Sequence, residues 1–265
     1  MAAVEKKLII PISIIFVINL FLRLPLLNAS FERDEGVYSY IAQQMTKGLV
    51  PYKDAIDLKP PGIFVIYWIA FFLFGQNILS IHFMLMLFVF AGAVFLFLLG
   101  RKLWNDNVGI AAATTYCLLS ACMKFLGNAA NTEFFMNTAV IGGMLCLARA
   151  VKKNTFGLLF LSGISMGLAF IIKQPAGLII VFTACIIGID AYRKKAGAGT
   201  ALKKLGIFAF GSIVPLGITV PIFALFGAIR EYIYWAYQFS IRYSSLTTPE
   251  IGLVRILYIF KSTAL

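Results

Sequence analysis

The sequence predicts an all-α membrane protein, a bundle of about seven or eight transmembrane helices, and three observations support this fold class. Of its 265 residues, 61% are hydrophobic and only 13% are charged. The apolar residues form long runs rather than short alternations, so helices, and not barrel strands, are the expected spanning elements. The 23 lysine and arginine residues lie in short clusters between these runs, a pattern typical of membrane loops that argues against nucleic-acid binding.

Seven apolar runs approach or reach the length of about 20 residues that a helix needs to cross a bilayer. They cover residues 8–27, 80–100, 108–127, 131–149, 156–172, 176–191 and 205–228. An eighth run begins at about residue 251 and continues to Leu265. We therefore expect a single transmembrane domain over residues 1–265 that is incomplete at its C-terminus.

The topology depends on whether the apolar stretch 62–74 crosses the membrane. This stretch is shorter than the roughly 17 residues of the shortest spanning helices. If it does not cross, all the later basic clusters share the side of the first one, which the positive-inside rule assigns to the cytoplasm. These clusters are Lys6/Lys7, Arg101/Lys102, Arg149/Lys152/Lys153, Arg193 to Lys195 and Lys203/Lys204. We therefore expect a multi-pass protein of the plasma (inner) membrane, with its N-terminus in the cytoplasm and residues 62–74 at the outer interface.

This topology places a first outer loop at residues 28–79 and another at 229–250. The first loop should contain two short helices. One runs from about Glu35 to Lys47, with Asp34 as its N-cap and Gly48 ending it. The other follows Pro60 and Pro61, since proline is favoured in a first helical turn. The second loop is rich in tyrosine and tryptophan, which is typical of the aromatic belt at a membrane interface.

Several ionisable residues lie close to the outer ends of spans, where charge near hydrocarbon is expensive and therefore marks a candidate site. Asp34 and Glu35 follow the first span, Glu133 opens the fourth, and Lys173 ends the fifth. Lys173 could instead reach towards lipid phosphates, and Glu133 could serve only as a helix N-terminal carboxylate. Apart from Asp34, Glu35 and Lys59, the charges of the first loop are expected to be solvated. Together, the lysines could hold a phosphate while a carboxylate takes a proton from an attacking hydroxyl.

The remaining metal-binding residue types give no diagnostic pattern. Four cysteines, Cys117, Cys122, Cys146 and Cys185, fall inside apolar runs and are expected to act as small hydrophobic residues. His82 opens an apolar run and is expected to be an interfacial polar group rather than a ligand. The outer acids could hold a divalent cation, but no ligand set has a diagnostic spacing, and the sequence identifies no other cofactor.

Four ordered motifs resemble those of a known enzyme family. They are Arg33-Asp34-Glu35-Gly36-Val37-Tyr38, Asp57-Leu58-Lys59-Pro60-Pro61-Gly62, Asn131-Thr132-Glu133-Phe134 and Ile172-Lys173-Gln174-Pro175. In this order and at these topological places they resemble the GT-C membrane glycosyltransferases. The resemblance is to the bacterial branch related to protein O-mannosyltransferases, aminoarabinose transferases and Rgt-type galacturonosyltransferases, which is similar to glycosyltransferase family 39. It covers nearly the whole chain.

The resemblance implies a function for each motif. The family uses a polyprenyl-phosphate sugar at the outer leaflet, needs no nucleotide-binding domain and commonly inverts the anomeric centre by direct displacement. Asp34 would be the catalytic base, supported by Glu35, and Lys59 and Lys173 would bind the donor phosphate. Glu133 would be a second acidic residue that shapes the cleft. Val37 stands where aminoarabinose transferases have an arginine, so the phosphate contacts must differ. The acceptor could be a glycan, a lipid or a protein.

Two other function classes stay open from the sequence. A carrier or flippase for a lipid-linked or anionic solute would use the same outer cations. It would also need polar groups near the bilayer centre, where Asn19 and the pair Thr114/Thr115 are the main polar features. A non-catalytic assembly subunit would tolerate neutralisation of Asp34, whereas an enzyme that uses this base would not.

Overall fold

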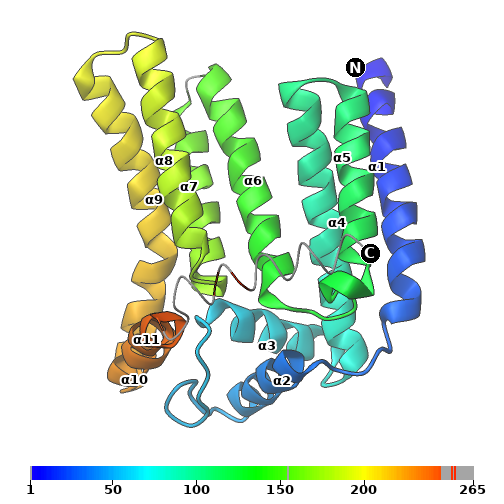
Figure 1. Ribbon diagram of the computed structural model, residues 1–265, viewed down its shortest axis with the longest axis vertical. Helices are drawn as coiled ribbons and strands as arrows, with labels where there is room; N and C mark the ends of the chain where they lie inside the picture. The colour runs from blue at the N-terminus through cyan, green and yellow to red at the C-terminus, as the bar shows by residue number, and fades with distance from the viewer. Residues whose placement is uncertain (1, 154, 246–251, 253, 255–265) are drawn as a thin grey trace.

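The computed structural model describes residues 2–153, 155–245, 252 and 254, and its regular elements are helices. The longer ones are α1 (Ala2–Arg23), α4 (Ile78–Leu103), α5 (Asp106–Ser120), α6 (Thr132–Lys153), α7 (Phe156–Ile172), α8 (Ala176–Arg193) and α9 (Ala198–Leu225). These stand side by side in Figure 1. At one end of the bundle lie α2 (Arg33–Thr46), α3 (Gly62–Phe74), α10 (Ile229–Ile233) and α11 (Ser240–Ser245). The predicted all-α fold is confirmed.

Among the described residues, five helices are long and apolar enough to cross a membrane. They cover Leu8–Leu26, Ile78–Leu103, Thr132–Lys152, Ala176–Arg193 and Ala198–Leu225. The helices α3 and α7 are apolar but shorter. The expectation of one continuous helix over 108–127 is wrong, because α5 ends at Ser120 and a 3-10 turn, Met123–Phe125, follows.

A buried arginine accounts for the early end of α5. Arg23, the last residue of α1, donates hydrogen bonds to the carbonyl oxygens of Ser120 and Gly127. Carbonyl groups at a helix end lack intrahelical partners, so a buried cation that binds them stabilises a chain turn at this point. The loop that follows α5 is thereby fixed beside the end of α1.

The basic clusters lie at the end of the bundle away from α2 and α3. Arg101 and Lys102 occupy the last turn of α4, and Arg193 the last turn of α8 (Figure 1). Two acids pair with neighbouring cations at this end. Asp106 contacts Arg101 at 2.8 Å, and Asp190 contacts Lys194 at 2.9 Å. The bundle therefore has one basic end, and the candidate site residues lie at the other.

The two short helices of the first predicted outer loop are present, with one correction. Glu32, and not Asp34, is the N-cap of α2. Its side chain accepts a hydrogen bond from the backbone nitrogen of Asp34, and Glu35 reciprocates by accepting from the nitrogen of Glu32 at 2.9 Å. This capping box sets the helix start two residues earlier than predicted. Gly48, with φ of 82°, ends the turn after α2 as expected.

The helix α3 has the predicted bounds and packs closely against α7. Pro61 is its N-cap, and Gly75, with φ of 88°, follows its last residue. A Cβ atom on Gly62 would lie 2.6 Å from the carbonyl oxygen of Ile171. Only glycine permits this approach of the two backbones, which brings the loop before α3 next to the end of α7.

Glycines also allow α7 and α9 to touch. A Cβ atom on Gly163 would lie 2.9 Å from the backbone nitrogen of Ser212, and one on Gly167 would collide with the carbonyl oxygen of the same residue. Small residues at helix crossings are typical of membrane proteins, where close van der Waals packing holds helices together.

The described part of the predicted loop 229–250 is helical. A π-helical stretch, Tyr234–Phe239, connects α10 to α11. Residues 246–250 lie outside the described residues, as does nearly all of the predicted eighth apolar run. Tyr232 is fully buried against Tyr52 and Phe223, so part of this aromatic segment belongs to the core of the domain.

Candidate functional site

Asp34 and Lys59 meet at the end of the bundle that carries α2 and α3. Asp34 lies in the first turn of α2, and Lys59 lies in the loop before α3. The Lys59 Nζ atom is 3.9 Å from the Asp34 Oδ2 atom, and both side chains are about one-third exposed (28% and 32%). Arg33 also contacts Asp34 Oδ1 at 3.1 Å. The structure therefore pairs the predicted base with one predicted phosphate-binding lysine, and leaves both within reach of a ligand.

Asp57 adds a carboxylate that the sequence analysis assigned to the solvated surface. Its Oδ1 atom accepts a hydrogen bond from the backbone nitrogen of Lys59 at 2.8 Å, and the side chain is only partly exposed. Burial raises the pKa of Asp57 above its ordinary value, with the nearby Asp34 charge acting in the same direction. The hydrogen bond from Lys59 opposes this rise without cancelling it. Asp57 therefore helps to set the conformation of the loop that presents Lys59.

Tyr38 connects the acidic residues of the site. Its buried hydroxyl group donates a hydrogen bond to Asp34 Oδ2 at 3.4 Å. Burial raises the pKa of Tyr38, and so do the nearby charges of Asp34, Asp57 and Glu133. The phenol is thus held in its neutral, donating form. Tyr38 thus joins Asp34 to the buried part of the domain.

Glu133 and Lys173 form the second ion pair of this region. Glu133 lies in the first turn of α6, and Lys173 follows the last residue of α7. Lys173 Nζ contacts Glu133 Oε1, while Glu133 Oε2 accepts a hydrogen bond from Thr132 Oγ1 at 3.1 Å. Each predicted phosphate-binding lysine is therefore paired with a predicted acidic residue.

Gln174 joins the two lysine-bearing segments, and the sequence analysis gave it no role. Its Nε2 atom donates to the carbonyl oxygens of Leu58 at 2.7 Å and Ala236 at 2.8 Å. The Ser240 hydroxyl also donates to the Leu58 oxygen, at 2.9 Å. Leu58 directly precedes Lys59, and Gln174 directly follows Lys173, so this amide fixes the two lysines relative to each other.

The loop before Lys59 is anchored from a second side. The Tyr52 hydroxyl donates to the carbonyl oxygen of Lys59 at 2.7 Å. Tyr52 adopts φ of 69°, a left-handed conformation that is strained for a bulky residue. Its ring is fully buried against Phe64 and Phe223. Such strain persists only where the surroundings enforce it, which is common at functional sites.

Glu35 lies behind the exposed site, in a fully buried position. Its Oε1 atom is 3.0 Å from His82 Nε2 and accepts from the backbone nitrogen of Ala130 at 2.7 Å. His82 Nδ1 is also 3.0 Å from the carbonyl oxygen of Leu27. Glu35 therefore contacts neither Lys59 nor Lys173, and it acts on Asp34 through the backbone. His82, expected to be an interfacial polar group, is almost fully buried within the protein.

The described residues offer no recognisable metal centre. Among them, no group of three or more histidine, cysteine or acidic residues is arranged to hold an ion. Asp34 and Glu133 each contact a lysine instead, and lysine is a residue that binds anionic groups.

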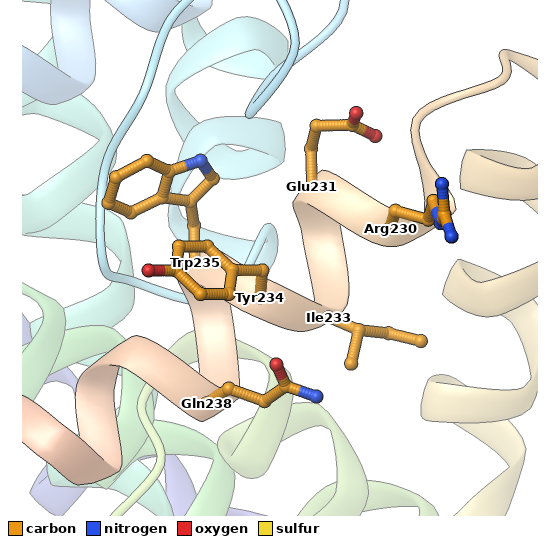
Figure 2. A pocket seen from close by; sticks show the side chains of 6 residues that line it. All are labelled: Arg230, Glu231, Ile233, Tyr234, Trp235 and Gln238. Carbon is orange, nitrogen blue, oxygen red and sulfur yellow. The ribbon is translucent and has the colours of Figure 1, made fainter.

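Two concave surfaces include a residue of the site or of a segment bound to it. A groove of about 550 Å³ is lined by Arg230, Glu231, Ile233, Tyr234, Trp235 and Gln238, shown in Figure 2. All six belong to one helical segment, which Gln174 holds through Ala236. The second concavity, of about 260 Å³, is largely apolar, and Glu133 lies in its wall together with residues of α5.

Comparison with known proteins adds two findings. A family model described as dolichyl-phosphate-mannose-protein mannosyltransferase matches residues 58–223, a range that contains Lys59, Glu133 and Lys173 and begins after Asp34. An undecaprenyl phosphate-alpha-4-amino-4-deoxy-L-arabinose arabinosyl transferase from Wigglesworthia glossinidia brevipalpis is 28% identical over 194 residues, which cover 69% of this chain. The match takes in 34% of that relative, so the chain spans about a third of its length.

Proposed function

Because the chain belongs to the dolichyl-phosphate-mannose-protein mannosyltransferase family, we propose that it is a membrane glycosyltransferase that takes its sugar from a polyprenyl-phosphate donor. The acceptor is a hydroxyl group of a glycan, lipid or protein at the outer face of the membrane. The name of the arabinosyl transferase relative supports an undecaprenyl-phosphate type of donor. The four ordered motifs of the sequence support the same assignment.

The observation that carries this proposal is the contact between Lys59 and Asp34, at 3.9 Å. A lysine binds phosphate as a compact charge, and a carboxylate beside it can accept a proton from an incoming hydroxyl. A reaction that joins a hydroxyl oxygen to a sugar carbon and releases a phosphate needs both groups in one place.

The reaction then proceeds as a direct displacement. Asp34 takes the proton of the acceptor hydroxyl group, and the oxygen of that hydroxyl attacks the anomeric carbon of the sugar. The bond between that carbon and the phosphate oxygen breaks, and polyprenyl phosphate leaves with the bonding electrons. Lys59 and Lys173 stabilise the charge of the departing phosphate. Attack opposite the phosphate inverts the anomeric centre, and Glu133 holds Lys173 in the cleft.

The membrane arrangement follows from the two ends of the bundle. We propose that α1 and α4 to α9 all cross the bilayer, with the basic end in the cytoplasm and the site at the outer face. The shorter α5 and α7 stand between longer spans in Figure 1. Local thinning of the bilayer accommodates short spans at modest cost. The helix α3 then lies at the outer interface, and residues 1–265 form one transmembrane domain.

Asp34→Asn tests the proposed function most directly. Sugar transfer from radiolabelled polyprenyl-phosphate donors is measured in membranes at matched expression. We expect a loss of about a hundredfold or more, because general base catalysis typically contributes about 10²–10⁴-fold. Asp106→Asn makes the same chemical change at the opposite end of the bundle and should leave transfer unchanged.

The other outcomes separate the alternatives. Unchanged transfer in Asp34→Asn would exclude Asp34 as the base and direct attention to Glu133 or Asp57. If the unmodified chain transfers no sugar from any donor in a broad panel, a carrier or a non-catalytic assembly subunit becomes the better assignment. Transport of a labelled lipid-phosphate sugar across proteoliposomes would then distinguish these two.

A further inference from the structure

The buried contact between His82 and Glu35 joins four segments of the chain beneath the site. His82 belongs to α4 and Glu35 to α2, and both side chains are almost fully excluded from solvent. These two side chains also bind Leu27, which follows the 3-10 turn after α1, and Ala130, in the loop before α6. Neither residue contacts the predicted phosphate-binding lysines, so this network is separate from the one formed by Gln174.

The hydrogen positions in this network follow from its acceptors. The carbonyl oxygen of Leu27 carries no hydrogen, so His82 Nδ1 must be protonated to bind it. One further proton then lies between His82 Nε2 and Glu35 Oε1, at a separation of 3.0 Å. The pair is either an imidazolium with a carboxylate or a neutral imidazole with a carboxylic acid. A hydrogen bond joins the two side chains in both forms, so His82 holds Glu35 in either one.

Glu35 connects His82 to the backbone of both acidic motifs. Its Oε2 atom accepts from the backbone nitrogen of Glu32, the N-cap of the helix that carries Asp34. Its Oε1 atom accepts from the nitrogen of Ala130, three residues before Glu133. One carboxylate thus fixes the backbone on which both Asp34 and Glu133 are mounted.

We propose that His82 is a positioning residue for sugar transfer, which holds Asp34 at its working distance by binding Glu35. The proposal rests on the proposed function, in which Asp34 is the base. Lys59 and Lys173 are held separately, by Tyr52 and Gln174. Loss of the His82 contact should therefore lower kcat and leave the KM for the lipid-phosphate donor nearly unchanged.

Two amide substitutions at His82 each retain one of its two hydrogen bonds. In His82→Gln, the amide nitrogen takes the place of Nε2 and can donate to Glu35. In His82→Asn, it takes the place of Nδ1, so it can reach Leu27 but not Glu35. We expect His82→Gln to retain kcat within about threefold, and His82→Asn to lose roughly tenfold to a hundredfold, because a displacement of about 1 Å can cost a hundredfold in rate. The donor KM should stay within about twofold in both.

Backbone hydrogen exchange gives a second readout that does not require catalysis. In the full chain in detergent, the peptides that contain Glu32 and Ala130 should exchange faster in His82→Asn than in His82→Gln or the unmodified protein. The peptide that contains Leu58 should be unaffected and serves as the internal control. Gel filtration and thermal unfolding establish that both variants are folded.

The outcomes separate the two proposals. Equal loss of kcat in both variants, or a loss that appears mainly as a higher donor KM, would overturn the positioning role of His82. Unchanged exchange at Glu32 and Ala130 in His82→Asn would also overturn it. If the unmodified chain transfers no sugar, the proposed function fails, while the exchange experiment still decides whether His82 fixes the two backbone segments.

Discussion

The side-chain nitrogen of Gln174 lies 2.7 Å from the carbonyl oxygen of Leu58, although 116 residues separate the two in sequence. Each of them adjoins a lysine, so this contact holds the segments that carry Lys59 and Lys173 side by side at one end of the bundle. Two positive charges repel each other unless the backbone holds them in place. The amide of Gln174 supplies that restraint without adding a charge of its own.

Gln174→Ala should weaken donor binding. The substitution removes the bonds to Leu58 and Ala236 and leaves two partly buried carbonyl groups without this donor. Such losses cost about 1–3 kcal/mol, which corresponds to roughly a tenfold rise in the donor KM with a smaller change in kcat. Steady-state transfer kinetics measure both constants. Gln43→Ala, at an exposed amide of the same end, is the control. An unchanged donor KM in Gln174→Ala would mean that Gln174 does not hold the two lysines in place for donor binding.

Lys59→Ala should also raise the donor KM, by roughly tenfold to a hundredfold. The reason is the loss of a charged hydrogen bond to phosphate, which contributes about 1.5–3 kcal/mol. Lys53→Ala removes an exposed lysine from the same loop and should have little effect. The measurement is transfer at a series of donor concentrations. Similar KM values for the two variants would mean that Lys59 contributes only to the general charge of the surface.

Asp57→Asn should stabilise the protein at high pH. Burial raises the pKa of Asp57 in the folded state, so folding favours its protonated form. The stability due to this preference is complete below the pKa of the unfolded chain, about 3.9, and is lost as pH rises through the higher folded value. Asparagine resembles the protonated acid, and its Oδ1 atom can still accept from Lys59. Thermal unfolding of both proteins from pH 4 to 8 should show their Tm values diverging as pH rises. A variant that is less stable at pH 8 would refute this.

Gly62→Ala should destabilise the domain and disturb the site. The new methyl group would lie 2.6 Å from the carbonyl oxygen and 2.9 Å from the carbonyl carbon of Ile171, which are backbone atoms that cannot rotate away. Gly36 is the control, because a methyl group there meets no atom within 4 Å. Gly36→Ala should raise stability by about 0.5–1 kcal/mol, since alanine is the better helix former. Thermal unfolding distinguishes the two, and opposite signs are expected.

Local sequence signals predicted the short helices well. The bounds of α3 were evident because Pro61 precedes an apolar run and Gly75 follows it, and both residues act through their own backbone preferences. The start of α2 was harder, because both Glu32 and Asp34 can cap a helix. The reciprocal bond between Glu32 and Glu35 decides between them. The early end of α5 depends on Arg23, which lies about a hundred residues away, so the apolar run alone could not indicate it.

Only the site residues to which a sequence motif assigns a role could be predicted. The structure pairs Lys59 with Asp34 and Lys173 with Glu133, and the common outer cleft stays a prediction. Asp57 could have been found, because an aspartate commonly accepts from the backbone two residues later, as it does here with Lys59. His82 and Gln174 could not, since their partners are brought to them by tertiary packing. The sequence shows no pattern that relates His82 to Leu27 and Glu35.

The contact of α7 with α9 through glycines has a mechanical consequence. No side chain separates their backbones at Gly163 and Gly167, so neither helix can tilt without the other. The first helix ends beside Lys173, and the second leads into the segment that contains Ala236. At this contact the two helices are therefore expected to move together. Gln174 ties Leu58 to the end of α7, so we expect the loop that carries Lys59 to follow any motion of this pair.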